Sequence, residues 1–160
     1  MTYQKDISHD KSLSELGIEA CWFVTHTTIA FLILVAVLGV MSLNHPDPDS
    51  SAPKMLATVL AFFVPMAGGF LFARKHRSNI ASYVWISGLV IFSIVCVWVL
   101  DLPTGNGLCE NCRASEKLWR TFFTFTHGSG LIDGDGLLIG TWIPLSMIGY
   151  AVGSRLAIFR

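Results

Sequence analysis

Long apolar segments without charge alternate with short polar segments along this chain. Four segments contain no Asp, Glu, Lys or Arg, and they cover residues 20–43, 55–73, 80–100 and 136–154. A helix rises about 1.5 Å per residue, so about 20 residues cross a hydrocarbon layer about 30 Å thick. Lipid offers no partner to an unpaired backbone group, which favours helices even for 80–100, where β-branched residues alone would favour a strand. The pattern predicts an all-α integral membrane protein with four transmembrane helices.

The composition is that of a chain made almost wholly of one membrane domain. Of the 160 residues, 52% are hydrophobic and 14% are charged, against about 25% charged residues in soluble domains. We expect a cytoplasmic polar tail at 1–17 and a single transmembrane domain at 18–160, which includes a long outer link at 101–135. The first segment follows four acidic groups and has no small-residue cleavage site behind it, so it is expected to be a span rather than a cleaved signal. A net charge of zero argues against nucleic acid as a partner.

The distribution of Lys and Arg predicts how the chain crosses the membrane. The N-terminal tail, the link after the second segment and the C-terminus carry seven of these residues, and the two other links carry four. Loops on the cytoplasmic side hold the excess of Lys and Arg. Both termini are therefore predicted to lie in the cytoplasm, with the bacterial inner membrane as the expected location.

Two prolines are expected to lie in the middle of helices. Pro65 should disturb its helix at Ala61 and Pro144 at Gly140, because the proline ring clashes with the carbonyl four residues before it. Thr141 is placed to satisfy a carbonyl that such a kink frees. A fixed kink in a packed bundle is favoured over a hinge, since proline is common in membrane helices.

The fourth segment also carries two pairs of small residues spaced by four. The pairs are Gly136 with Gly140 and Gly149 with Gly153. Because glycine lets helix backbones approach closely, both pairs are candidate helix-packing residues. The nine-residue step from Gly140 to Gly149 turns a helix by roughly 180°, so the pairs are expected to contact neighbours on two sides. Contacts within the same bundle are favoured over contacts with a second protein.

His26 is the one strongly titratable side chain inside a predicted span. Ionisable residues at membrane depth are candidates for function, which makes His26 a weak candidate for binding a cofactor or a proton. A transmembrane haem would normally need a second axial histidine, and no other predicted span contains one. The favoured interpretation is a neutral imidazole that is hydrogen-bonded to Ser87 or Tyr150, which are expected at a similar depth.

The outer link holds a Cys-x-x-Cys pair, Cys109 and Cys112. In an oxidising compartment the two thiols should form a disulfide, which is either a structural staple or a redox centre. A zinc site is a further possibility, with His127 and either Asp133 or Asp135 completing four ligands. The staple is favoured, so that no cofactor is predicted and quinone and zinc are kept as alternatives.

The redox alternative has two supporting features. Arg113 and a helix that begins near Ser115 are placed to favour a thiolate. Four spans with a cysteine pair in an outer link resemble the membrane disulfide-forming oxidases and the vitamin K epoxide reductase family, a resemblance that implies a quinone. Those families relay electrons through a second cysteine pair, whereas Cys21 and Cys96 lie alone near opposite ends of different spans, so the chain is not assigned to either family.

The segment 115–125 predicts a short amphipathic helix in the outer link. Its aromatic side should lie in the outer membrane–water boundary, although a lid packed on the bundle is the competing interpretation. Glu116 and Arg120 are expected to pair across one helical turn. The apolar side is formed by Leu118, Trp119, Phe122, Phe123 and Phe125.

The function cannot be read from a motif, so it is predicted from the class of protein. The leading hypothesis is a non-catalytic accessory subunit or helix-packing module of a larger membrane complex, whose partners are the lipid bilayer and other membrane subunits or a second copy. The alternative is a membrane thiol–disulfide or quinone-linked redox protein that uses Cys109 and Cys112. A small oligomeric transporter or channel comes third.

Overall fold

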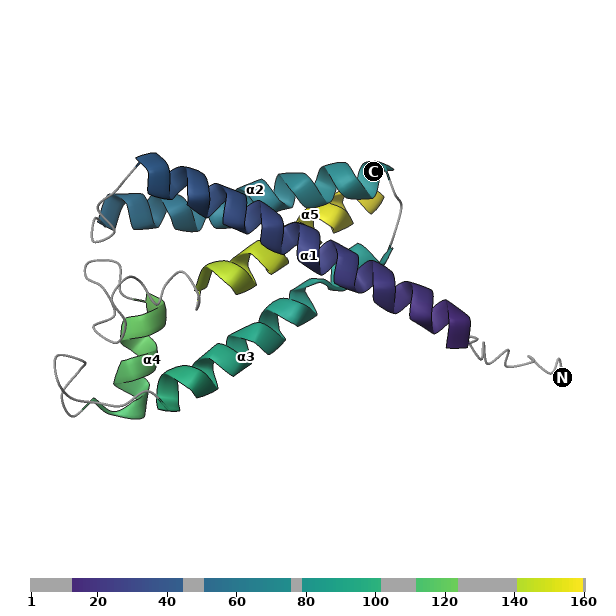
Figure 1. The fold of residues 1–160 in the computed structure, drawn as a ribbon. Helices are drawn as coiled ribbons and strands as arrows, with labels where there is room; N and C mark the ends of the chain where they lie inside the picture. The colour runs from purple at the N-terminus through teal and green to yellow at the C-terminus, as the bar shows by residue number, and fades with distance from the viewer. Residues whose placement is uncertain (1–12, 45–50, 76–78, 102–111, 124–140, 160) are drawn as a thin grey trace, which may run out of the picture.

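The computed structural model describes residues 13–44, 51–75, 79–101, 112–123 and 141–159, and these residues contain helices and no strand. Figure 1 shows the order of the elements along the chain. They are α1 (Leu13–Asn44), α2 (Ser51–Lys75), the 3₁₀ helix η1 (Asn79–Tyr83), α3 (Trp85–Asp101), α4 (Ala114–Phe123) and α5 (Ile143–Ile158). The all-α class predicted from the sequence is confirmed.

Three helical stretches in the described part of the chain are long and apolar enough to cross a membrane. They cover Ser14–Leu43, Met55–Lys75 and Asn79–Asp101, the last of which joins η1 to α3. These are the lengths and compositions of a membrane protein. The fourth helix, α5, is apolar but has 16 described residues, and 136–140 lie outside the described residues. A fourth span therefore stays a prediction.

The first two helices extend beyond the predicted spans at both ends. α1 begins at Leu13, inside the stretch predicted as a polar tail, and Glu15 in its first turn has the charge that stabilises a helix N-terminus. A helix can include polar residues before the membrane begins. The uncharged run therefore marks only the part of the helix that is suited to lipid. α2 likewise continues past the predicted end to Lys75.

The third predicted span starts as a tighter turn rather than as an α-helix. The Ser82 hydroxyl donates a hydrogen bond of 2.6 Å to the carbonyl of Asn79, and the Ser87 hydroxyl donates one of 2.6 Å to the carbonyl of Val84. Serine side chains that bond to nearby backbone carbonyls compete with regular helical pairing. The regular helix α3 follows at Trp85.

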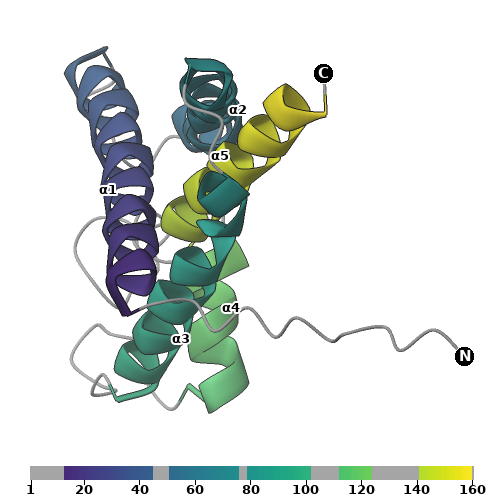
Figure 2. The same ribbon diagram turned by 90° about the vertical axis from the view of Figure 1, so that its right-hand side faces the viewer.

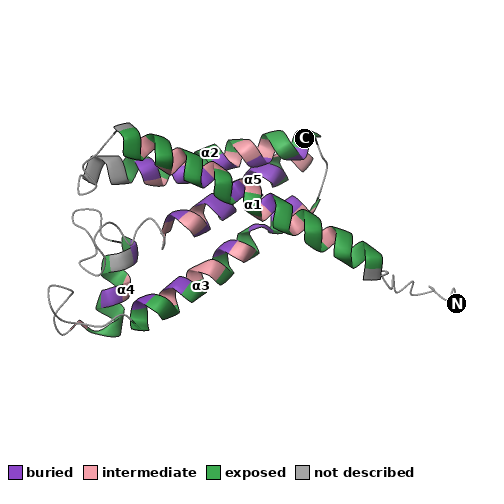
Figure 3. Ribbon diagram, viewed as in Figure 1, coloured by how far each residue is buried: buried purple, intermediate pink, exposed green. Residues whose placement is uncertain are grey.

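α5 is the centre of the arrangement. It packs against α2 along most of its length and also touches α1, η1 and α3. α2 and α5 run in the same direction, while α1 crosses them in the opposite direction and α3 diverges from them (Figures 1 and 2). The buried residues lie where α1, α2 and α5 face one another, and the outer sides of α1 and α3 are exposed (Figure 3).

The core is divided into three clusters. One joins α1, η1 and α5 through Ala30, Ala81, Val84, Met147 and Tyr150. A second joins α1, α2 and the start of α5 through Leu34, Ala57, Ala61 and Trp142. A third lies apart from these, between α3 and α4, and consists of Val95, Val99 and Phe122.

The helix α4 packs on α3, and its aromatic residues divide between two sides. Phe122 is buried, whereas Trp119 and Phe123 stack on each other with ring centroids 5.2 Å apart and remain exposed. The Lys117 ammonium donates to the carbonyl of Leu100 near the end of α3, at 3.2 Å. The predicted pair of Glu116 and Arg120 is present at 2.8 Å. α4 therefore packs against the end of α3, and its predicted place, in the membrane–water boundary or as a lid on the bundle, stays a prediction.

Candidate functional site

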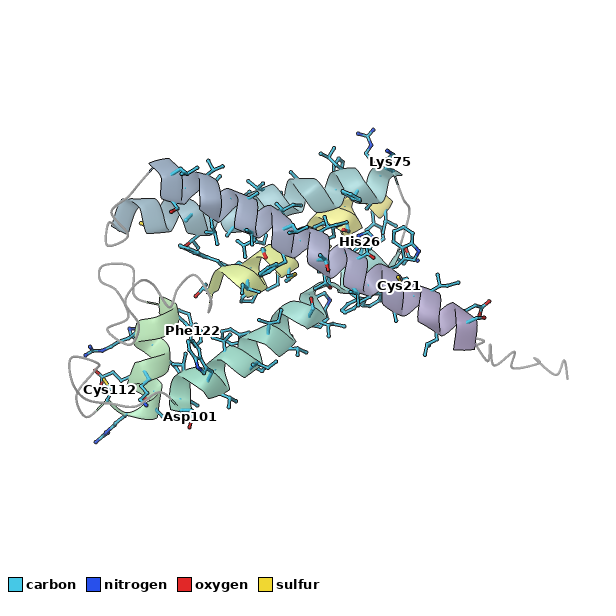
Figure 4. The ribbon with its side chains drawn as sticks, in the orientation of Figure 1. Cys21, His26, Lys75, Asp101, Cys112 and Phe122 are labelled. Carbon is cyan, nitrogen blue, oxygen red and sulfur yellow. The ribbon has the colours of Figure 1, made fainter. Side chains whose placement is uncertain are left out.

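The candidate site is the buried polar pair formed by His26 of α1 and Tyr150 of α5. His26 belongs to the stripe of α1 that recurs every three or four residues and faces the bundle, together with Ala30 and Leu34. His26 and Tyr150 are both fully buried, at 0% exposure. Figure 4 shows His26 where α1 crosses α5.

His26 Nδ1 and Tyr150 Oη lie 2.8 Å apart and form a hydrogen bond. Ser87 and Tyr150 were the two partners predicted for His26 from their expected depth, and Tyr150 is the one that bonds to it. Ser87, the other one, donates to the carbonyl of Val84 and accepts a bond of 3.3 Å from the Thr27 hydroxyl. Thr27 follows His26 on α1, so two neighbouring positions of this helix make polar contacts with two different elements.

Aromatic rings from three helices surround the imidazole. The centroid of its ring lies 5.8 Å from that of Trp22, 5.8 Å from that of Tyr150 and 6.4 Å from that of Phe72, whose ring meets it edge-on. The second ring nitrogen, Nε2, is also buried. These contacts tie α1, α2 and α5 together at one level of the bundle.

The arrangement is well suited to fixing helix positions. A hydrogen bond between membrane helices contributes about 0.6 to 1.7 kcal/mol, and it also specifies which faces meet. Among the residues that the structure describes, no three His, Cys, Asp or Glu side chains come together as a metal site would require. His127, Asp133, Asp135 and Cys109 lie outside those residues, so the zinc hypothesis stays a prediction.

The cysteines of the described chain fall into two groups. Cys21 is exposed and Cys96 is half-buried, and both carry free thiols. Cys112 is not among the free thiols, and it lies two residues before α4, near the C-terminal end of α3 (Figure 4). Because Cys109 is outside the described residues, the pairing of Cys109 with Cys112 stays a prediction, as does any redox role for it.

The second feature of interest is the contact between α2 and α5, which we call the glycine seam and define by Gly69, Gly149 and Gly153. A Cβ atom at Gly149 would lie closer than 3.0 Å to the carbonyl oxygen of Phe62, and one at Gly153 would meet that of Met66 in the same way. A Cβ atom at Gly69 would meet the carbonyl oxygen of Tyr150. Backbone thus packs directly on backbone from both sides, as occurs where Cα–H groups face carbonyls of a neighbouring helix.

The α2 side of this contact is a signal that sequence reasoning missed. Every fourth residue of α2 is small or compact and is buried against neighbouring helices. This spacing places the residues on one face of the helix and could have been read from the sequence, since small residues mark membrane helix interfaces. The residues are Ala57, Ala61, Pro65, Gly69 and Ala73.

Pro65 lies in the interior of its helix, as predicted, whereas Pro144 lies near the start of the described part of its helix. Pro65 lies inside α2, which continues as one helix on either side of it. Pro144 lies in the first turn of the described α5. The backbone N–H groups of a first turn have no partner within the helix, so the missing N–H of proline costs no hydrogen bond there. The Thr141 hydroxyl donates to the carbonyl of Phe122 in α4, at 2.8 Å. Gly136 and Gly140 lie outside the described residues.

Comparison with models of protein families, with curated proteins and with solved structures finds no match for this chain. The function is therefore argued from the chemistry and packing of its residues.

Proposed function

We propose that the protein is a non-catalytic, multi-pass membrane protein that serves as an accessory subunit of a larger membrane complex. The observation that carries the proposal is a stripe of small polar residues on the outward side of α1. Cys21, Thr25 and Thr28 share this side at helical spacing, and all three are exposed. Small and hydroxyl-bearing residues are enriched where membrane helices meet, because they allow close approach.

The hydroxyls of this stripe do not need water. Thr25 donates to the carbonyl of Cys21 at 2.8 Å, and Thr28 donates to that of Val24 at 2.9 Å. With its polar groups satisfied inside α1, the stripe presents a smooth surface to another helix. The inward stripe of α1, which holds His26, is already occupied by α2 and α5, so the outward stripe is the side left for a partner.

The packing of α5 supports a fourth membrane span. α5 runs beside α2 and in the same direction, so a membrane that holds α2 also surrounds α5. We infer that α5, extended by residues before Ile143, is the fourth span, and that α4 lies in the membrane–water boundary at the outer end of α3. With four spans both termini lie on one side, and the excess of Lys and Arg there assigns it to the cytoplasm of a bacterial inner membrane.

The partner proposal is tested by the mass of the particle in a mild detergent or in lipid nanodiscs. We expect the wild-type protein to be extracted in a complex heavier than the single 17.6 kDa chain, with a second membrane polypeptide in fixed ratio. The double variant Thr25→Trp/Thr28→Trp should release the monomer, because two large rings hold the partner helix away from α1.

The matched control is Leu71→Trp, which adds a ring at an exposed position of α2 outside the stripe. This variant should leave the complex intact. A wild-type protein that is monomeric in nanodiscs would contradict the proposal, as would equal release of the partner by Leu71→Trp.

The orientation is tested separately with reporter fusions. A reporter fused after Arg160 should be active only if it requires the cytoplasm, and one inserted near Asn106 only if it requires the opposite side. The reason is the seven-to-four distribution of Lys and Arg between the two sets of links. Activity of both reporters on the same side would remove the fourth span, and a reversed pattern would invert the topology.

A further inference from the structure

A groove lies between α5 and the junction of η1 with α3, at the end of the molecule where α2 also ends. Ala151 and Ser82 in it are buried, and its other lining residues are exposed. α2 ends at Lys75, and η1 begins shortly after it in the sequence. The end of the groove that η1 forms is therefore level with the charged end of α2, where Figure 4 labels Lys75. The groove is lined by Ser82, Trp85, Ile148, Ala151, Val152 and Arg155.

The wall contributed by α5 is apolar for most of its length and cationic at one end. Ile148, Val152 and Arg155 follow one another on the same side of the helix at spacings of four and three. From Ile148 to Arg155 the helix rises about 10 Å, which is two turns of apolar surface that ends in a guanidinium. This side of α5 is turned away from the glycine seam, so the groove is separate from the contact with α2.

Two side chains that carry hydrogen-bond donors line the groove. Arg155 is exposed and, within the residues that the structure describes, makes no ion pair. Trp85 is 39% exposed, and its indole N–H has no acceptor in the same part of the chain. A planar guanidinium binds phosphate through paired donors, and tryptophan prefers the headgroup level of a bilayer.

We propose that this groove, the Arg155 groove, binds one anionic glycerophospholipid. An acyl chain lies against Ile148 and Val152, and the phosphate accepts hydrogen bonds from Arg155 and Trp85. Inorganic phosphate would make no contact with the apolar wall. An apolar protein helix would bury the Arg155 guanidinium without a negative partner. Basic pockets between membrane helices recognise lipid headgroups by this combination of charge and apolar surface. The inference goes beyond the proposed function and requires only that the protein lies in a membrane.

The experiment is native mass spectrometry of the purified full chain with phosphatidylglycerol or phosphatidylcholine added to the detergent. We expect a single bound phosphatidylglycerol and much weaker retention of phosphatidylcholine. Arg155→Gln should reduce the occupancy by phosphatidylglycerol about fivefold, the effect of one cation near an anionic lipid surface. Val152→Trp, at an exposed position, should reduce it further by filling the groove.

The matched control is Arg74→Gln at the same end of the molecule. The Arg74 guanidinium lies 5.8 Å from the centroid of the Phe70 ring and outside the groove, so its loss should leave lipid occupancy unchanged. Equal loss in Arg74→Gln and Arg155→Gln would overturn the proposal in favour of general surface charge. It would also be overturned by full occupancy in Val152→Trp, or by displacement of the lipid with sodium phosphate. Because the isolated chain is used, these outcomes are independent of whether a protein partner exists.

Discussion

Gly153→Ala is expected to lower the free energy of unfolding by about 3 kcal/mol, the upper part of the range for overpacking a tight interior. The new Cβ would lie 2.8 Å from the carbonyl carbon of Met66 and 3.0 Å from the backbone nitrogen of Phe70. Backbone atoms cannot rotate away as a side chain can, so α2 and α5 must separate along their whole contact. Thermal unfolding in detergent, followed by circular dichroism, measures the effect.

The matched control is Gly39→Ala on α1. A Cβ there has nothing within 4 Å, and alanine in a helix is more favourable than glycine by roughly 0.5 to 1 kcal/mol. The same chemical change should therefore be neutral or stabilising at Gly39. Equal stability of the two variants would mean that α2 and α5 do not touch at the glycine seam.

Tyr150→Phe is expected to lower the free energy of unfolding by about 1 to 2 kcal/mol, because a buried polar group that loses its partner keeps its desolvation cost. The phenyl ring preserves the packing, and only the oxygen 2.8 Å from His26 Nδ1 is removed. His26→Leu should cost a similar amount. The same unfolding measurement applies.

The double variant distinguishes a hydrogen bond from two independent packing effects. Once both partners are apolar, no polar group is left buried, so the loss in Tyr150→Phe/His26→Leu should be clearly smaller than the sum of the single losses. Ser87→Ala serves as the comparison, since Ser87 was the other predicted partner and its hydroxyl bonds elsewhere. Additive losses at His26 and Tyr150, or strong coupling of His26 with Ser87, would contradict the assignment.

The parts of this fold that could be predicted depend on the solvent rather than on tertiary contacts. An uncharged run of about 20 residues predicts a membrane helix whatever it packs against, and the described part of the chain contains three such helices. The exact ends could not be predicted, because a helix such as α1 continues into polar sequence, where hydropathy no longer marks it. The start of α3 depends instead on hydroxyl bonds from Ser82 and Ser87 that a window of average hydropathy does not register.

Contacts between helices were harder to predict for a different reason. An amphipathic pattern shows that Phe122 and Trp119 share a side of α4, but not that Phe122 is buried while Trp119 remains exposed. The regular spacing of small residues in α2 indicates an interface without naming its partner. His26 was more tractable, because a polar group at a known depth has few possible partners, and Tyr150 was one of two.

The glycine seam has a consequence for how the protein is made. α2 ends at Lys75, and α5 begins at Ile143 and ends at Ile158, so roughly 80 residues are synthesised between the end of α2 and the end of its main partner. At about 5 to 20 residues per second, the interval is on the order of 4 to 17 seconds. During this time the side of α2 that belongs to the glycine seam is uncovered, because the ribosome has not yet synthesised α5. The nascent chain is therefore open to wrong helix pairing until α5 packs on α2, and a chain cut short before α5 would leave this side of α2 uncovered permanently.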